Sequence, residues 1–341
     1  MNKIDVLSKI NEGMRAVLAK EDELAGNAND TSAGFEQMRL NYTAGRAYWV
    51  EGGPEMAEKV DCKVEGPHGD IPVRLYYPVK DRASLASDGE TLPAIVYAHG
   101  GGFVLGNLDT HDRICRVLAS KTGAAVAAVD YRLSPEAKFP VAVEEVACVA
   151  KHLHEQGEAY GIDGNRLSFA GDSGGAHLSL AATMYLREEL GGSDYVKCLL
   201  LFYGWYGLKD SASQRLLGGP WDGLTEAEWQ WYKELYAEDT AQLETSPYAN
   251  LFLNDLTRDM PSCYIAAAEY DPLKDDSTAL ATILEEYGIP HRFEMFEGVI
   301  HAFLHYTKML DEANLALEHG AEHFRQQMGC YRSRYALPTT L

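Results

Sequence analysis

The stretch Leu167-Ser-Phe-Ala-Gly-Asp-Ser-Gly-Gly-Ala176 carries the strongest signal in the chain. It starts with a short apolar run, passes through the G-x-S-x-G pentapeptide Gly171–Gly175, and continues into a helix-like segment. A serine on such a strand-to-helix turn has strained backbone, and small residues flank it because a Cβ there would collide with neighbouring main chain. Glycine-flanked serines also occur in ordinary turns. We predict that Ser173 is a nucleophile displayed on this turn.

Short apolar runs recur on both sides of this stretch. Runs of this length without polar interruption are typical of strands buried on both faces of a parallel sheet. They cover residues 94–98, 125–129, 167–170, 199–203 and 264–268, with a last candidate at 292–296. The amphipathic segments between them are long enough for crossover helices; they are 111–121, 141–156, 175–190, 275–287 and 310–327. Residues 60–64 and 73–77 alternate apolar and polar across the turn 67–70, which predicts an antiparallel hairpin. We expect an α/β fold with a mostly parallel eight-stranded sheet covered by helices on both sides.

Two segments interrupt this alternation. Residues 1–56 are predicted to form an N-terminal helical cap segment, and residues 204–259 a cap insertion; the core is then 57–203 with 260–328, and 329–341 is a C-terminal tail. The insertion holds four of the five tryptophans, so it could roof the strand carboxyl ends where open α/β sheets bind ligands. The alternative is a helical insertion with a small core of its own. The tentative pocket residues are Phe103, Asp172, Trp205, Tyr206 and Trp221.

Composition narrows the classes of partner. The 30 Lys and Arg residues against 51 Asp and Glu give a formal net charge of −21, a field that repels nucleic acid and anionic lipid. The apolar positions of the first twenty residues have helical spacing and no signal-peptide pattern, and no apolar stretch approaches the ~20 residues needed to cross a bilayer. The six cysteines lie far apart without a C-x-x-C pair. We expect a cytoplasmic protein with free thiols that binds neither nucleic acid nor membrane.

A second motif, His99-Gly100-Gly101-Gly102, directly follows the run 94–98. Backbone N–H groups can approach the oxyanion of a tetrahedral intermediate only where no side chains intrude, and a glycine run at a strand end provides them. Three glycines also form tight loops or phosphate cradles, but the lysine and hydroxyl of a P-loop do not follow them here.

A serine nucleophile needs a base, and the base needs an orienting carboxylate. His301 follows the last strand candidate after a short turn, and Asp271 follows the strand candidate 264–268. Their order after Ser173 is that of the α/β hydrolases. Asp275 and Asp276 are competing carboxylates. The pairs His301/His305 and His319/His323 have the H-x-x-x-H spacing of metal ligands but lack the adjacent glutamate of the zincins, so we expect no metal and no cofactor.

These motifs together resemble a known family. His99–Gly102, Asp130–Glu136 (DYRLSPE), Gly171–Gly175, Asp271–Leu273 and Gly298–Phe303 are similar to the hormone-sensitive-lipase-like branch of the α/β hydrolases, over about residues 60–328. More narrowly, Gly106–Ile114, Leu216–Thr225 and His301–Tyr306 resemble the acetyl esterases of that branch, cap included.

The resemblance implies Ser173 as nucleophile, His301 as base and Asp271 as its orienter. It also implies the amides of Gly100, Gly101 and Gly174 as the oxyanion hole, although the family usually has alanine at 174. We therefore expect a metal-free serine esterase that acts on short-chain acyl esters. A second copy of the chain, in a homodimer, is also among the expected partners. The resemblance alone adds a maltose-regulon transcription activator as a partner. The alternatives are a non-catalytic small-ligand receptor and an interaction protein on the same fold.

Overall fold

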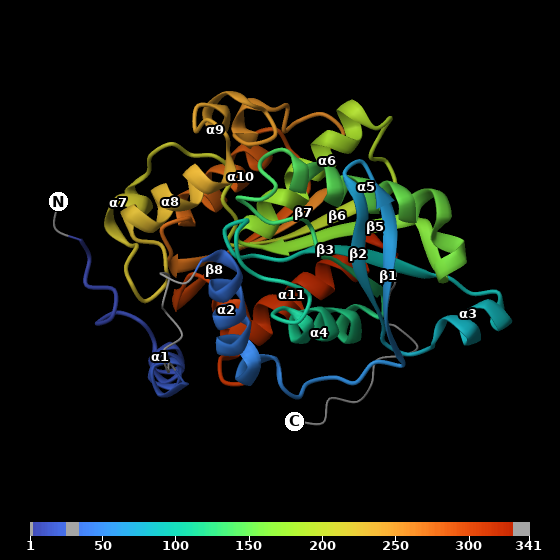
Figure 1. Ribbon diagram of the computed structural model, residues 1–341, viewed down its shortest axis with the longest axis horizontal. Coiled ribbons are helices and arrows are strands. Elements are labelled where there is room, and N and C mark those ends of the chain that lie inside the picture. The colour runs from blue at the N-terminus through green and yellow to red at the C-terminus, as the bar shows by residue number, and fades with distance from the viewer. Residues whose placement is uncertain (1–2, 25–33, 330–341) are drawn as a thin grey trace.

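The computed structural model describes residues 3–24 and 34–329, and its centre is one eight-stranded sheet (Figure 1). The strands are β1 (Glu58–Gly66), β2 (Gly69–Tyr77), β3 (Leu92–Ala98), β4 (Ala125–Val129), β5 (Ile162–Asp172), β6 (Val196–Phe202), β7 (Ser262–Tyr270) and β8 (His291–Ile300). Their spatial order is β1-β2-β4-β3-β5-β6-β7-β8. β1 and β2 form the antiparallel hairpin, in register from Glu58 opposite Tyr77 to Gly66 opposite Gly69. β2 also pairs antiparallel with β4, and every other pairing is parallel, so the predicted α/β sheet is confirmed.

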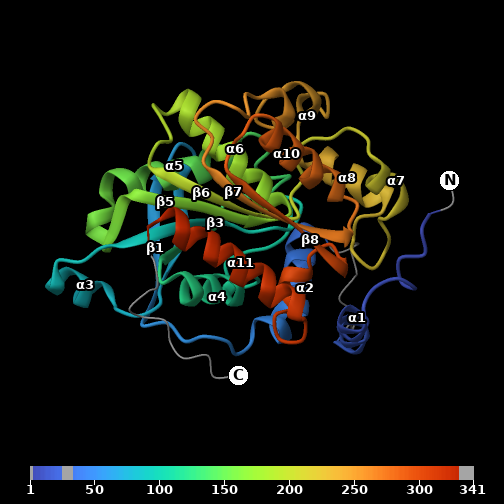
Figure 2. The same ribbon diagram turned by 180° about the vertical axis from the view of Figure 1, so that it is seen from behind.

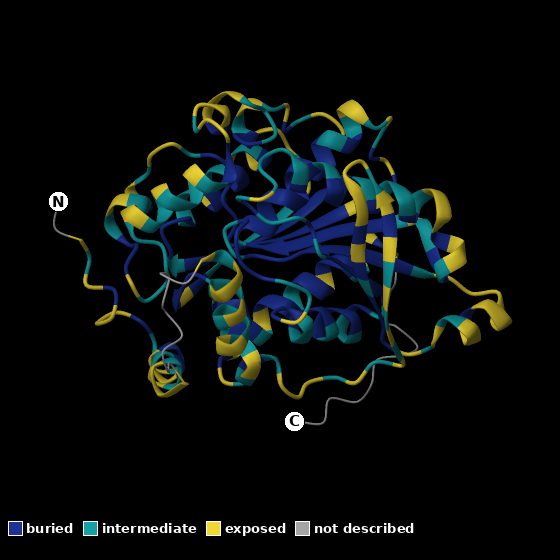
Figure 3. Cartoon of the chain, viewed as in Figure 1, coloured by how far each residue is buried: buried dark blue, intermediate teal, exposed yellow. Residues whose placement is uncertain are grey.

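Helices cover the sheet on both faces (Figures 1 and 2). On one face lie α5 (Val141–Gln156), α6 (Gly174–Glu189) and α10 (Lys274–Glu286); on the other lie α4 (Asp112–Thr122) and α11 (Asp311–Gln327). Apolar side chains of the strands divide between two buried cores, one under each helix layer. Figure 3 shows the central strands as the most continuously buried part of the chain. Fully apolar strands such as β4 are therefore buried on both faces, as their sequence predicts.

Two covering segments stand at the carboxyl end of the parallel strands (Figure 2). The N-terminal one contains α1 (Glu12–Leu24) and α2 (Phe35–Val50); the one between β6 and β7 contains α7 (Ala212–Leu216), α8 (Glu226–Tyr236) and α9 (Gln242–Thr245). Arg39 fastens α2 to the core, because its guanidinium donates to the carbonyls of Val104 (2.9 Å) and Ser134 (2.8 Å) and to Glu136 (2.7 Å). α1 and α2 lie within residues 1–56, and α7, α8 and α9 lie within residues 204–259.

One helix forms within a polar run of the sequence. The polar run 80–91 reads as a loop in the sequence, yet α3 (Arg82–Asp88) forms there. Asp81 accepts a bond from the N–H of Ser84 (2.7 Å) as its N-cap, and Gly89 closes it in the left-handed conformation. The predicted tail lies almost wholly outside the described residues. Within the part described, five cysteines are free thiols, and no helix is both long and apolar enough to span a bilayer.

Candidate active site

Ser173 lies on the turn between β5 and α6, with a backbone φ of 54°. Its N–H donates to the carbonyl of Phe202 at the end of β6 (2.9 Å), which holds the turn against the sheet. The flanking glycines are required by space: a Cβ at Gly175 would lie 2.0 Å from the carbonyl oxygen of Ala98, and one at Gly171 would lie 2.3 Å from that of Gly175. A non-glycine residue at positive φ costs on the order of 1–3 kcal/mol, so the backbone at Ser173 is strained and is held in place by the surrounding contacts.

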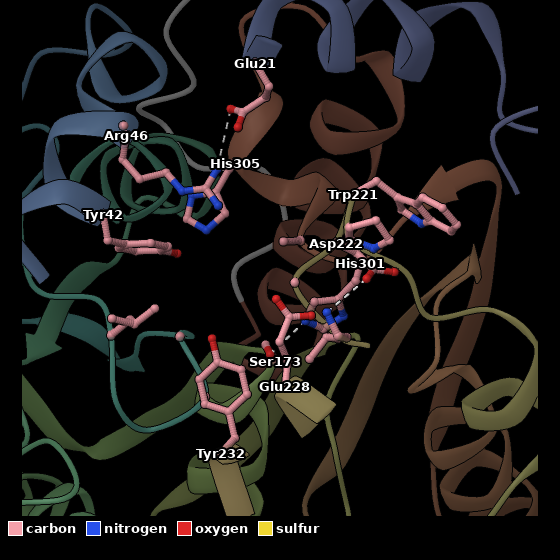
Figure 4. Close-up of a pocket in the computed structure, with 18 of the residues that line it drawn as sticks. Glu21, Tyr42, Arg46, Ser173, Trp221, Asp222, Glu228, Tyr232, His301 and His305 are labelled. Carbon is pink, nitrogen blue, oxygen red and sulfur yellow. Dashed lines mark hydrogen bonds and ion pairs between the residues drawn. The ribbon is translucent and has the colours of Figure 1, made fainter. Parts of the chain in front are cut away.

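Two further side chains come from neighbouring strand ends. His301 follows β8, and its Nε2 lies 2.9 Å from Ser173 Oγ (Figure 4). Its Nδ1 lies 2.8 Å from Oδ2 of Asp271, which follows β7. Asp271 is fully buried and also accepts the N–H of Leu273 (2.7 Å). Burial alone would lower the pKa of His301, but the Asp271 carboxylate outweighs it and raises that pKa above its ordinary value.

The competing carboxylates have other partners. Asp276 is fully buried, and its Oδ1 accepts the N–H groups of residues 206, 207 and 208 at 2.8–3.1 Å. Asp275 Oδ2 accepts the N–H of Ser213 (2.8 Å). Both carboxylates therefore anchor the beginning of the segment between β6 and β7, at the N-terminus of α10, and only Asp271 of the three contacts His301.

Replacing Asp276 with alanine is expected to destabilise the protein. The substitution leaves three N–H groups without their shared acceptor, and buried donors without partners are costly, so the loss should be on the order of 3 kcal/mol. Asp276→Asn keeps one acceptor oxygen and should cost less. Urea unfolding of the two variants measures this; equal midpoints for Asp276→Ala and the unsubstituted protein would show that this anchor contributes nothing.

In the glycine loop after β3, some backbone N–H groups already have a hydrogen-bond acceptor and others do not. The N–H of Gly100 donates to Oδ1 of Asp172 (3.0 Å), so this N–H already has an acceptor, and we remove Gly100 from the predicted donors to the oxyanion. Gly101 and Gly102 line the same cavity as Ser173, as does Gly174 at the start of α6. Among the described residues, none accepts a hydrogen bond from the N–H of these three glycines. His99 turns inward: its Nδ1 lies 2.9 Å from the carbonyl of Gly100, and burial lowers its pKa to about 3.

Gly174 replaces the alanine usual in the resembled family, and Phe103 accounts for it. A Cβ at 174 would lie 3.2 Å from the Phe103 ring, tighter than ordinary packing. That ring stacks on Tyr236 with centroids 3.7 Å apart, so it has little room to retreat. The glycine therefore accommodates an aromatic side chain of the glycine loop beside Ser173.

A buried polar cluster lies behind this loop. Atoms of His111, Asp172 and His305 lie within 4.8 Å of one another, so these three could in principle hold a cation. Asp172 Oδ1 already accepts bonds from Tyr97 (2.6 Å) and Gly100, and it lies 3.3 Å from His111 Nε2. Burial would raise the pKa of Asp172, but His111 lowers it well below its ordinary value. His319 and His323 instead contact Glu294 (2.9 Å) and Ser262 (3.0 Å).

Chelation is expected to leave the reaction rate unchanged. Ser173, His301 and Asp271 form a complete relay among themselves, and Asp172 Oδ1, 3.3 Å from His111 Nε2, already accepts two hydrogen bonds. Ester hydrolysis before and after dialysis against EDTA measures this. Loss of activity with EDTA and its recovery with zinc would contradict a metal-free site.

A cavity of about 1570 Å³ opens above Ser173. Its walls include four of the tentative pocket residues, Phe103, Asp172, Trp205 and Trp221. Tyr206 is not in its lining: the side chain is fully buried in the core below α10, and its N–H is held by Asp276. Two adjacent aromatic residues of this segment therefore have different surroundings: Trp205 faces the cavity, and Tyr206 faces the core.

Several lining residues escaped the sequence analysis. Glu21 of α1 and Tyr42 and Arg46 of α2 face the cavity from the N-terminal side, while Asp222 and Tyr232 face it from the segment between β6 and β7 (Figure 4). Asp222 is next in sequence to Trp221, a predicted pocket residue, and this position could have identified it. The residues of α1 and α2 lie far from every motif in the sequence, and nothing local marks them.

Known proteins share both the sequence pattern and the architecture. Residues 95–305 match the family described as alpha/beta hydrolase fold. An esterase of Pyrobaculum calidifontis is 31% identical, with 93% of this chain and 98% of that chain covered and a TM-score of 0.83. A thermophilic and thermostable carboxylesterase cloned from a metagenomic library is 29% identical over 87% of this chain and 98% of that chain, with a TM-score of 0.78. Together with the motifs around Ser173, these matches show that the chain belongs to the hormone-sensitive-lipase-like branch of the α/β hydrolases.

Proposed function

We propose that this protein is a serine carboxylesterase that works through a covalent acyl-enzyme. The observation that carries the proposal is the unbroken contact from Ser173 Oγ through His301 to Asp271, with Ser173 and His301 at the floor of a cavity. The similar solved proteins named esterase and carboxylesterase support it. A receptor on the same fold would not need a base 2.9 Å from the serine oxygen. The homodimer and the maltose-regulon activator remain predictions.

The proposed reaction has two halves. Ser173 Oγ attacks the ester carbonyl while His301 Nε2 takes its proton, and Asp271 fixes the imidazole tautomer and stabilises the imidazolium. The N–H groups of Gly101 and Gly102 in the loop after β3, and of Gly174 at the N-terminus of α6, are the proposed donors to the oxyanion. His301 then gives the proton to the leaving alcohol. Water, activated by His301, hydrolyses the acyl-enzyme and restores Ser173.

We expect short acyl chains to be preferred. Phe103, which stacks on Tyr236, and Trp205, only 4% exposed, line the cavity together with Ser173, and we expect their rings to limit the length of the acyl chain. Each buried CH₂ of an acyl tail contributes about 0.8 kcal/mol until the tail reaches the wall, after which further methylenes clash or return to water. Turnover of p-nitrophenyl esters of two to sixteen carbons, measured as kcat/KM, tests both the activity and the preference. An optimum at the longest chains would contradict the short-chain preference, and no turnover of any ester would contradict the esterase.

A further inference from the structure

The strand that leads to His301 is irregular just before it reaches this residue. Ala268 of β7 pairs with Phe296 of β8, but the next pairing, two residues later in β7, is with Ile300. Glu269 of β7 therefore faces three residues of β8, which form a bulge. A bulge bends its strand and changes the direction of the side chains that follow, and bulges are frequent next to active sites. The direction in which His301 leaves the sheet therefore depends on this bulge.

The backbone of the bulge needs contacts other than those of a regular strand. Gly298 has a φ of 73°, a conformation that glycine adopts at little cost, and Ala302, directly after His301, has a φ of 62°. The N–H of Gly298 donates to the Glu269 carboxylate (2.8 Å) and not to a main-chain carbonyl of β7. A side chain of β7 therefore holds the bulge from one side.

Asn11, just before α1, holds the bulge as well. Its backbone N–H donates to the carbonyl of Gly298 (2.9 Å). Its side-chain Nδ2 donates to the carbonyl of Glu297 (3.3 Å) and to Oε1 of Glu312 on α11 (2.6 Å). The approach is close, because a Cβ at Gly298 would lie 2.7 Å from that of Asn11. Glycine is therefore required at 298 by space as well as by its φ.

Asn11 is itself held firmly. Its Oδ1 accepts the N–H of Met14 (2.8 Å), as the side chain of an N-cap residue does. Ile10 and Met14, on either side of it in sequence, are buried in the same apolar core as Ile300. In both views α1 lies on the side of the molecule where β8 ends the sheet (Figures 1 and 2). A segment with buried side chains on both sides of Asn11 can hold the bulge in one position.

We propose that Asn11 is a positioning residue for His301: together with Glu269 it holds the bulge of β8 that directs the imidazole between Ser173 and Asp271. The imidazole must meet two partners at once, at 2.9 Å and 2.8 Å, so a shift of its backbone disturbs both contacts. Neither Asn11 nor Glu269 belongs to the described residues that line the cavity, so both act through His301 and not on the substrate. This proposal rests on the proposed esterase function.

Asn11→Ser tests this role without removing the helix cap. Serine is as good an N-cap residue as asparagine, so α1 keeps its cap, but serine lacks the NH₂ group that reaches Glu297 and Glu312. We expect kcat for p-nitrophenyl acetate to fall about tenfold, because a small misplacement of a reacting group is costly. KM should stay within about twofold, because the cavity wall is unchanged. Unchanged kcat, or a change confined to KM, overturns the proposal.

Asp81→Ala is the control for a general loss of stability. Asp81 caps α3 through the N–H of Ser84 (2.7 Å), at the end of the molecule opposite β8 (Figure 1). Its removal should lower the temperature of thermal unfolding and leave kcat as it was. If Asp81→Ala lowers kcat as much as Asn11→Ser does, the effect of Asn11 is only structural and the proposal is wrong.

Two substitutions of Glu269 provide a second test. Glu269→Ala removes the acceptor of the Gly298 N–H and should also lower kcat with little change in KM. Glu269→Gln keeps an acceptor oxygen there and should lose much less; equal losses in the two variants would show that this hydrogen bond does not position His301. The unsubstituted protein separates the two claims. Its failure to hydrolyse p-nitrophenyl acetate refutes the esterase, whereas hydrolysis that Asn11→Ser leaves intact refutes only the positioning role.

Discussion

Ser173→Ala is expected to reduce ester hydrolysis by a factor on the order of 10⁴ to 10⁶ in kcat. The substitution removes the attacking oxygen, and no other hydroxyl of the described residues lies within hydrogen-bond distance of His301 Nε2. Alanine keeps the Cβ that the turn at φ 54° already accommodates, and the N–H bond to Phe202 is unaffected. The loss should therefore be chemical rather than structural. Initial rates with p-nitrophenyl acetate, together with thermal unfolding of the same preparation, measure both.

Ser168→Ala is the matched control. Ser168 is a buried serine on β5, the same strand that leads to Ser173, and its hydroxyl donates to the carbonyl of Cys198 (2.8 Å) far from the cavity wall. Its loss should lower stability slightly and leave turnover as it was. Near-normal turnover by Ser173→Ala, free of contaminating esterase, would overturn the assignment of the nucleophile.

Asp271→Asn is expected to cost about 10⁴ in kcat, by analogy with measured triads. The carboxylate oxygen 2.8 Å from His301 Nδ1 keeps that nitrogen protonated and leaves Nε2 free to accept the serine proton. An asparagine NH₂ placed there favours the opposite tautomer. Asp275→Asn is the control, because Asp275 is four residues away, bonds to Ser213, and has no contact with His301. A larger loss from Asp275→Asn would move the orienting role.

The same substitution should shift the pH dependence. Only neutral His301 can accept a proton, so activity rises with pH through the pKa of this residue, which Asp271 holds above 6.5. Without the carboxylate charge the protonated form loses its stabilisation, and the acidic limb of kcat/KM should move to lower pH. A limb that stays in place in Asp271→Asn would show that another group controls it.

Most of the fold and the reacting residues follow from local sequence signals. Each apolar run, such as 125–129, became a strand because its residues can be buried on both faces of a parallel sheet. Ser173, His301 and Asp271 each follow a strand, and the carboxyl ends of parallel strands meet at one edge, so their convergence depends on topology that the strand pattern already contains.

Residues whose place depends on tertiary packing were harder to predict. Gly100 was expected to offer its N–H to substrate, but a carboxylate 72 residues away takes it. Tyr206 and Trp205 are adjacent in an irregular segment, where no periodicity tells which side chain faces the cavity. Arg46 reaches the site because Arg39 fastens α2 to the loop around Val104, an interaction that joins positions 65 residues apart.

The attachment of α2 through Arg39 has a consequence for how this protein can diversify. Arg39 donates hydrogen bonds to the main-chain carbonyls of Val104 and Ser134, and these carbonyls are present whichever side chains occupy the two positions. The residues of α2 that face the cavity can therefore change without loss of this attachment, while Ser173, His301 and Asp271 at the strand ends stay the same. The cavity wall and the three reacting residues can therefore evolve separately.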